Sequence, residues 1–220
     1  MPSASPATSS PSAAPPAASG FQIAFRTGAM FPLGEASGAA ADDLARRYAW
    51  QIPFLLDVGG RFARSFFVGG YLGFGIGATG SDARVDGACR DDDDNGRNDI
   101  ACSAASFRIG VELEYSFAPD EPINPWIGYG IGFEGASASI KDDYAGLDET
   151  DASSGITFAD FSAGFDLRHK VGFGPFIDVA LGQYRETTTD LGARGKYHYT
   201  IEDRALHVWL TLGLRFVVNP

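Results

Sequence analysis

The acidic stretch from Cys89 to Cys102, CRDDDDNGRNDIAC, carries the spacing in this sequence that is most typical of a metal-binding motif. Aspartate or asparagine stands at alternate positions, and Gly96 follows where such a loop turns sharply. Short oxygen-bearing side chains in this pattern can wrap a hard cation such as Ca²⁺. The stretch therefore predicts a weak calcium site. Its expected ligands are Asp91, Asp93, Asn95 and Asp99.

The same stretch departs from a full calcium loop in two respects. A bidentate glutamate belongs at the twelfth position, where Cys102 stands, and the helices that flank an EF-hand loop are missing. The stretch resembles the calcium repeats of the thrombospondin type 3 family, which combine such loops with cysteines. The alternative is an acidic loop that a disulfide closes and water solvates, with no bound ion.

Cys89 and Cys102 are the two cysteines of the chain, and both lie in this polar stretch. Their proximity predicts a local disulfide and therefore an oxidising compartment. The alternative is a pair of free thiols in a cytosolic protein. A zinc site is not expected, because two thiolates without a nearby histidine make an incomplete ligand set.

Charged side chains at every second position form the second feature that could carry chemistry. Between Phe107 and Phe117, large apolar residues alternate with a set that includes Arg108, Glu112 and Glu114. In a strand, this period of two places the charges on one face, where a dry core accepts them only as pairs. Other segments repeat the pattern. The predicted inner-face charges are Arg26, Asp57, Arg108, Glu112, Glu114, Glu134, Asp160, Asp166, Arg168, Asp178, His207 and Arg215.

The segment from Arg204 to Val218 indicates which elements position these charges. From Leu206 to Phe216 every second residue is large and apolar, so the alternation holds over more than ten residues. A strand of a soluble protein usually holds it for about five or six residues, whereas a tilted transmembrane strand needs about 9–11. The apolar face would then contact lipid and the mixed face would line a barrel lumen.

Seven further segments show the same alternation, so the sequence predicts an all-β fold, an eight-stranded antiparallel up-and-down transmembrane β-barrel. Their connections alternate between long and short, which places short turns at one rim and four long loops at the other. In the sixth strand, Thr157 is expected on the outer face and Phe158 on the inner face. The predicted strands are Phe21–Phe31, Tyr48–Gly60, Ser65–Ala78, Phe107–Phe117, Trp126–Glu134, Thr157–Arg168, Pro175–Tyr184 and Leu206–Val217. The predicted long polar loops include Gly135–Gly155 and Glu186–Asp203.

In this architecture, residues 21–218 resemble the small eight-stranded outer-membrane proteins of the OmpA, OmpX and OmpW type. The resemblance implies a barrel in the bacterial outer membrane, in contact with its lipid, with short turns and both termini in the periplasm. The end of the chain looks like the polar-x-Gly-x-x-hydrophobic-x-hydrophobic signal that barrel-assembly machinery recognises, although such chains usually end on an aromatic residue and this one does not. The matching residues are Thr211, Gly213, Phe216 and Val218.

Two interpretations of the inner-face charges remain open. An eight-stranded barrel is only wide enough for its own side chains to fill, so the charges predict a paired network that plugs the lumen. The alternative is a gate in which arginine–carboxylate pairs exchange partners and open a narrow path, as the resemblance to OmpA-type barrels would allow. The candidates for such a gate are Arg108, Glu112 and Arg215, because the first and last strands close the barrel.

The composition agrees with strands and tight turns rather than helices. The chain holds 28 Gly, 17 Phe, 8 Tyr and 3 Trp, and no apolar run approaches the length of a transmembrane helix. Its formal net charge of −11 argues against a nucleic-acid partner, whose phosphates it would repel. Residues 1–20 are rich in Pro, Ser and Ala, which predicts a disordered linker. They lack the regions of a signal peptide, so we expect that the native export signal was removed and that Met1 was added.

Catalysis is not expected, although barrel enzymes such as lipid A deacylases exist. Such an enzyme needs a histidine with a serine and an acid near the outer leaflet. The three histidines are His169 beside a short turn, His198 in a loop and His207 on an inner face, and none has an evident serine and acid partner on the lipid face.

The sequence therefore predicts a monomeric outer-membrane barrel with a structural or surface-interaction role and a plugged lumen. One alternative is a narrow channel for small or hydrophobic solutes. Another is a soluble barrel of the lipocalin kind, whose lumen would be apolar and would carry a ligand.

Overall fold

The computed structural model describes residues 20–39, 42–80, 89, 100–142, 147–167 and 171–218. The predicted linker 1–20 therefore lies outside them except for its last residue. Short helical segments within these residues are α1 (Leu44–Arg47) and η1 (Gly192–Arg194). The strands are β1 (Gly20–Gly34), β2 (Tyr48–Phe62), β3 (Phe66–Thr79), β4 (Ile100–Ser116), β5 (Ile123–Asp142), β6 (Leu147–Leu167), β7 (Gly172–Asp190), β8 (Lys196–Thr200) and β9 (His207–Val218).

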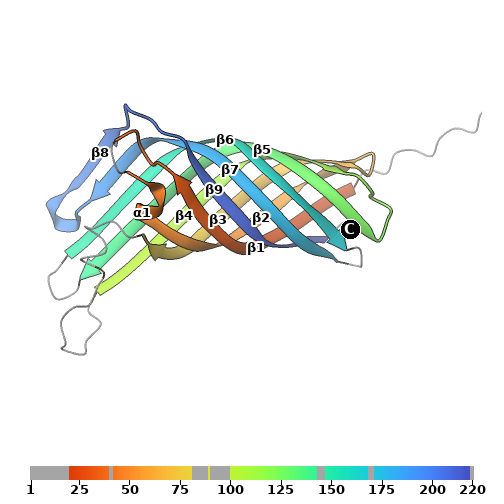
Figure 1. Cartoon of the computed structure of the whole chain (residues 1–220), viewed down its shortest axis with the longest axis horizontal. Coiled ribbons are helices and arrows are strands. Elements are labelled where there is room, and N and C mark those ends of the chain that lie inside the picture. The colour runs from red at the N-terminus through yellow and green to blue at the C-terminus, as the bar shows by residue number, and fades with distance from the viewer. Residues whose placement is uncertain are drawn as a thin grey trace, which may run out of the picture.

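Eight of these strands close into an antiparallel barrel (Figure 1). Each strand from β1 to β7 pairs with its neighbour in the sequence, β7 pairs with β9, and β9 pairs with β1. The seam between β1 and β9 runs from Ile23 opposite Val218 to Gly34 opposite His207. β8 is not part of the barrel, because it pairs with the end of β7 alone. The predicted eight-stranded up-and-down barrel is confirmed.

Side chains alternate between the outside and the lumen along each barrel strand, as the period of two predicts. On β4, Phe107 and Val111 are exposed on the outer face, whereas Arg108 and Glu112 are buried in the lumen. The described strands therefore carry large apolar residues outside and charged residues inside. A soluble barrel that binds an apolar ligand requires the opposite distribution, so the fold argues against that alternative.

The predicted faces of Thr157 and Phe158 are wrong. Thr157 is buried in the lumen, and Phe158 is exposed on the outer face. The pairing of β6 with β7 shifts between Thr157 and Ala159, which is a β-bulge. One extra residue in a strand exchanges its two faces on one side of the bulge. The alternation predicted from Ala159 onward is correct, whereas Thr157 and Phe158 lie on the other side of this shift.

Two of the segments predicted as long polar loops are largely strands. β5 continues to Asp142 and β6 begins at Leu147, so the hairpin occupies most of Gly135–Gly155. β7 continues to Asp190 and then pairs with β8 within Glu186–Asp203. The apolar residues that alternate in these extensions are mostly small, as at Ala136 and Ala138, so the pattern is weak although Ala136 and Ile140 are buried. Cross-strand polar pairs hold them instead, as between the Ser139 and Thr150 hydroxyls at 2.9 Å.

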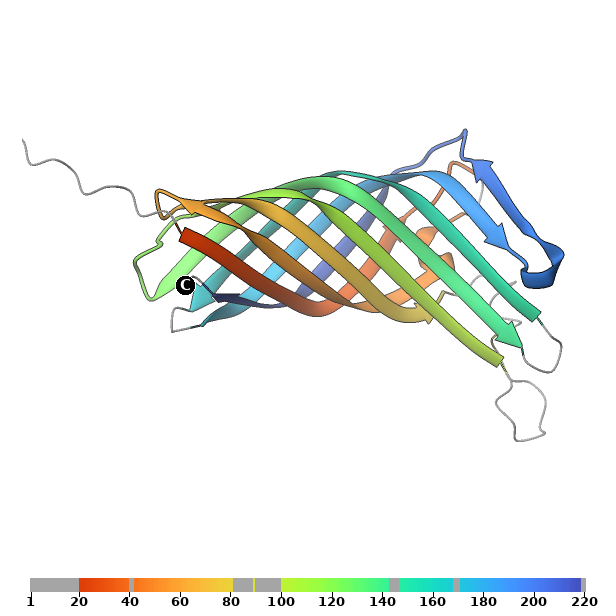
Figure 2. The ribbon, with the colours of Figure 1, turned by 180° about the vertical axis from the view of Figure 1, so that it is seen from behind.

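The two ends of the barrel differ (Figure 2). At one end lie the start of β1, the end of β9 and the short connections after β2, β4 and β6. At the other end, the extended strands β4 to β7 and the β7–β8 hairpin form a sheet that protrudes beyond the rest of the barrel. We call this extension the outer wall and define it by residues 100–106, 135–142, 147–154, 186–190 and 196–200. We call the end with the short connections the short-turn end, and the end with the outer wall the wall end.

A small apolar cluster lies in the lumen toward the wall end. Leu44 of α1 is fully buried, and it belongs to one cluster with Tyr48, Tyr184 and Trp209. The segment that carries α1 is held by Arg47, whose Nε lies 2.6 Å from Asp42. Within the described residues, no helix is long and apolar enough to span a membrane.

Candidate functional site: the charged lumen

At the short-turn end, Arg215 of β9 is the centre of an ion-pair group. Its Nη2 lies 2.7 Å from Glu114 Oε2, and its Nη1 lies 3.3 Å from Asp166 Oδ2. The guanidinium also stacks on Trp126, 4.2 Å from the ring centroid. Gln22 donates to the same glutamate oxygen at 3.0 Å. Glu114 is therefore held from two strands besides its own.

In the middle of the lumen, Arg26 of β1 binds carboxylates from three other strands. Its Nη2 donates to Asp57 at 2.7 Å and to Glu112 at 3.0 Å. Its Nη1 lies 3.5 Å from Asp178. All four side chains are buried, so the charges stabilise one another in a region from which water is largely excluded.

Arg108 of β4 forms a neighbouring group that shares one carboxylate with Arg26. Its Nη1 lies 3.4 Å from Asp178 and 3.6 Å from Asp160. Its Nη2 lies 3.5 Å from the sulfur of Met30. Asp178 therefore connects the two arginines, and the three groups together run through the lumen.

Toward the wall end, His207 of β9 and Glu134 of β5 form a separate pair. His207 Nε2 lies 2.6 Å from Glu134 Oε1, and the other glutamate oxygen accepts a hydrogen bond from Thr157 at 3.1 Å. The ring of Tyr184 stacks on the imidazole with centroids 4.1 Å apart. Gly182 provides the space, because a Cβ there would collide with the Glu134 carboxylate.

The buried charges of the lumen do not balance. Among the described residues, seven carboxyl groups and four arginines are buried, so the carboxyl groups outnumber the arginines by three. The fourth arginine, Arg61, donates to Ser116 at 2.8 Å near the short-turn end. Bulky side chains fill the space around the charges. The largest fully buried ones include Trp126, Trp209, Tyr48, Tyr184 and Phe67.

The predicted inner-face charges that the structure describes all lie in the lumen, and most of them are paired. For the three gate candidates, this pairing supports a plugged lumen rather than a gate. Arg108, Glu112 and Arg215 do not pair with one another, since each belongs to a different group. Arg168 lies outside the described residues.

The acidic stretch is described only at its ends. Cys89 and Cys102 form the predicted disulfide. Asp91, Asp93, Asn95 and Asp99 lie outside the described residues, so the calcium site remains a prediction.

The residues of the predicted assembly signal lie on β9. Thr211 and Gly213 face the lumen side, whereas Phe216 and Val218 are exposed on the outer face at the short-turn end. This arrangement places two apolar side chains of the last strand on the outside of the barrel. Their recognition by assembly machinery stays a prediction.

Sequence reasoning did not identify three polar residues of the network. Gln22 binds Glu114 but is not among the predicted inner-face charges, Arg61 lies just beyond the predicted strand Tyr48–Gly60, and the face predicted for Thr157 is the outer one. Gln22 alone carried a usable signal, since a polar residue at an inner position must find a partner. The bulge that turns Thr157 inward has no sequence signature here.

Comparison with known proteins supports the fold. No protein-family model matches the sequence, and no curated protein matches it. A major outer membrane protein from Thermus thermophilus aligns with a TM-score of 0.50 at 12% identity, over 91% of this chain and 99% of that one. Outer membrane protein AlkL aligns with a TM-score of 0.45 at 15% identity, over 100% of this chain and 98% of that one. Neisserial surface protein A aligns with a TM-score of 0.41 at 14% identity, over 90% of this chain and 97% of that one.

At this level of identity the similarity shows the fold alone, and this conclusion rests on the alignment with the Thermus protein. The chain has the fold of the small eight-stranded outer-membrane β-barrels, as the resemblance in its sequence implied.

Proposed function

We propose that this chain is a bacterial outer-membrane protein with a plugged lumen, and that its outer wall makes contacts outside the cell. The observation that carries the proposal is the continuation of β5, β6 and β7 beyond the apolar part of the barrel. A barrel that only anchors itself has no need of such a sheet. The wall carries short polar side chains and alanines in place of the large apolar residues of the barrel, and it leads away from the membrane.

The apolar outer face supports a position in lipid. Large exposed apolar residues such as Phe54, Val111 and Ile131 face outward in the middle of their strands. In water, so large an apolar surface would drive aggregation, whereas in a bilayer it is solvated by acyl chains. We place the short-turn end and both termini in the periplasm, because short turns face that side in bacterial barrels. Assembly machinery would read β9, and the barrel is monomeric.

The strand β8 gives the outer wall a free edge. Among the described strands β8 pairs with β7 only, so one of its edges can accept an extended segment of a partner. Tyr197 and Tyr199 are exposed on β8, and tyrosine is enriched at protein interfaces. A protein partner that adds a strand and packs against these rings fits this edge.

The closed lumen argues against transport as the main role. Ion pairs at 2.7–3.5 Å connect β1, β2, β4, β7 and β9 in the lumen, and opening a path would expose buried charges without partners. The narrow channel is the second candidate, and electrical conductance distinguishes it.

Surface display tests the proposed role of the wall. A Gram-negative host would display the native chain or a variant in which residues 188–199 are replaced by Asn-Gly. We expect both to migrate as folded barrels on unheated gels, and we expect cell–cell aggregation and adhesion to protein-coated surfaces to fall for the variant. A double variant, Tyr197→Ala with Tyr199→Ala, keeps the edge and tests the rings. Equal adhesion by all three would contradict the proposal.

A further inference from the structure

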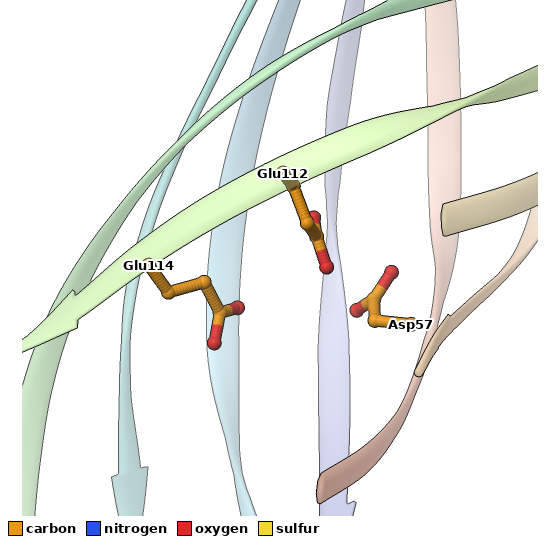
Figure 3. A group of neighbouring side chains, drawn as sticks. All are labelled: Asp57, Glu112 and Glu114. Carbon is orange, nitrogen blue, oxygen red and sulfur yellow. The ribbon is translucent and has the colours of Figure 1, made fainter. Parts of the chain in front are cut away.

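Three lumen carboxylates from two strands converge on one point. Asp57 of β2 and Glu112 and Glu114 of β4 each offer an oxygen within 4.8 Å of the others. Figure 3 shows the three side chains directed into the same part of the lumen. All three are buried. Such convergence of like charges in a water-poor site is costly unless positive charge compensates it.

The neighbouring arginines compensate it only in part. Within the trio, Arg26 donates to one oxygen of Asp57, Oδ1, and to one oxygen of Glu112, Oε2. The second oxygens, Asp57 Oδ2 and Glu112 Oε1, are buried and accept no hydrogen bond in the described part of the chain. Buried carboxylate oxygens without a partner are rare in folded proteins. They are the atoms that a bound cation would use.

The charge around Arg26 and Arg108 indicates the valence of that cation. These two arginines share four carboxylates: Asp57, Glu112, Asp160 and Asp178. Carboxyl groups therefore outnumber arginines by two in this group, while Arg215 is shared between Glu114 and Asp166 beside it. One divalent cation would balance the group.

Glycines flank the two glutamates on the neighbouring strands. On the neighbouring strands, Glu112 lies between Gly69 and Gly130, and Glu114 has Gly128 on one side. These positions contribute no side chain to the lumen next to the carboxylates. Side chains from elsewhere occupy part of the room beside these glycines, since a Cβ at Gly69 would meet the Phe67 ring and a Cβ at Gly128 would meet the Ser162 hydroxyl.

We propose that the lumen binds one hard divalent cation between Asp57, Glu112 and Glu114, with Ca²⁺ as the best fit. Calcium prefers carboxylate oxygens and tolerates irregular geometry, whereas Mg²⁺ demands a near-ideal octahedron. The ion uses the oxygens that Arg26 leaves free, so the ion pairs of Arg26 remain. It joins β2 to β4 across the lumen and stabilises the folded barrel by mass action. This site is separate from the one predicted in the acidic stretch.

Calcium binding to a refolded barrel tests the proposal. The background is the full chain with Asp91→Asn and Asp93→Asn, which removes the predicted loop site. After refolding in detergent and removal of metal by a chelator, equilibrium dialysis with radioactive Ca²⁺ at constant ionic strength counts bound ions. We expect one Ca²⁺ per chain and a higher temperature for the loss of the heat-sensitive gel form when Ca²⁺ is present.

Two substitutions in that background locate the ion. Glu112→Gln removes a ligand charge and should abolish both the bound Ca²⁺ and the thermal shift. Asp166→Asn is the matched control, because this buried carboxyl pairs with Arg215 outside the trio and should leave binding in place. If Glu112→Gln does not fold, Asp57→Asn is measured in its place.

Three results would overturn the proposal. The first is a loop-neutralised barrel that binds no Ca²⁺ in dialysis. The second is equal binding by the Glu112→Gln and Asp166→Asn variants. The third is displacement of the ion by Na⁺ in modest excess, which would assign the site to monovalent cations.

Discussion

Arg26 and Arg215 are register partners across the seam where the first and last strands close the barrel. Both guanidinium groups are buried, and like charges directly opposite each other repel. The two glutamates of β4 resolve this conflict, since Glu112 binds Arg26 and Glu114 binds Arg215. The inner face of β4 therefore holds the seam closed from the other side of the lumen.

Removing one of these arginines should weaken the barrel strongly. Arg215→Ala leaves Glu114 and Asp166 buried without their cation, which typically costs about 3–5 kcal/mol. Urea unfolding in detergent measures the free energy of unfolding, and the loss of the heat-sensitive gel form reports how much protein has unfolded. Arg64→Ala is the control, because the Arg64–Asp120 pair is exposed at a short turn and should contribute little. Equal effects of the two substitutions would contradict the role of the lumen network.

The His207–Glu134 pair should depend on the absence of a side chain at Gly182. A methyl group there would collide with Glu134 and lie 2.8 Å from His207 Nε2. Overpacking of this kind costs about 1–3 kcal/mol, so Gly182→Ala should lower the free energy of unfolding by that amount. Gly20→Ala is the matched control, because a Cβ at Gly20 meets no atom within 4 Å. An unchanged free energy of unfolding in the Gly182→Ala variant would show that the His207–Glu134 pair is not held as described.

The boundary between lipid and water should lie along β4. Val111→Arg places a charge on the outer face in the middle of the strand, and near the bilayer centre this costs about 2–4 kcal/mol. Ser103→Arg changes the same face of the same strand in the outer wall and should be tolerated. Refolding yields in phospholipid vesicles and urea titrations compare the two. If Ser103→Arg lowers the stability of the barrel and Val111→Arg does not, the membrane lies at another level along β4.

The predicted assembly signal should affect insertion in cells more than folding in vitro. Phe216→Ala removes an exposed ring from the end of β9, where it makes no lumen contact. We expect less folded protein in the outer membrane of a Gram-negative host, with unchanged refolding in detergent. Phe165→Ala removes a comparable exposed ring from β6 and serves as the control. If both variants insert equally well, the signal assignment is wrong.

The period of two predicted which face each residue occupies but not its partner. It placed Arg108 and Glu112 in the lumen because side-chain direction depends only on position in a strand. It could not pair Glu112 with Arg26, since the heights of residues on separate strands depend on strand tilt and register. The bulge at Phe158 and the strands of the outer wall were missed for a related reason. The bulge leaves no mark on the apolar pattern, and in the outer wall the alternating residues are small, as at Ala136 and Ala138. Both features are determined by pairing with neighbouring strands.

Conductance across a planar lipid bilayer tests the central claim most directly. In the proposed plug, Trp126, Trp209 and the ion pairs of Arg26 and Arg215 would leave no path for ions. The native barrel, refolded and shown to be inserted by its heat-sensitive migration, should give no single-channel steps under conditions in which a general porin conducts. Regular steps of constant size from the native barrel would contradict the plugged lumen and assign the protein to the narrow channels.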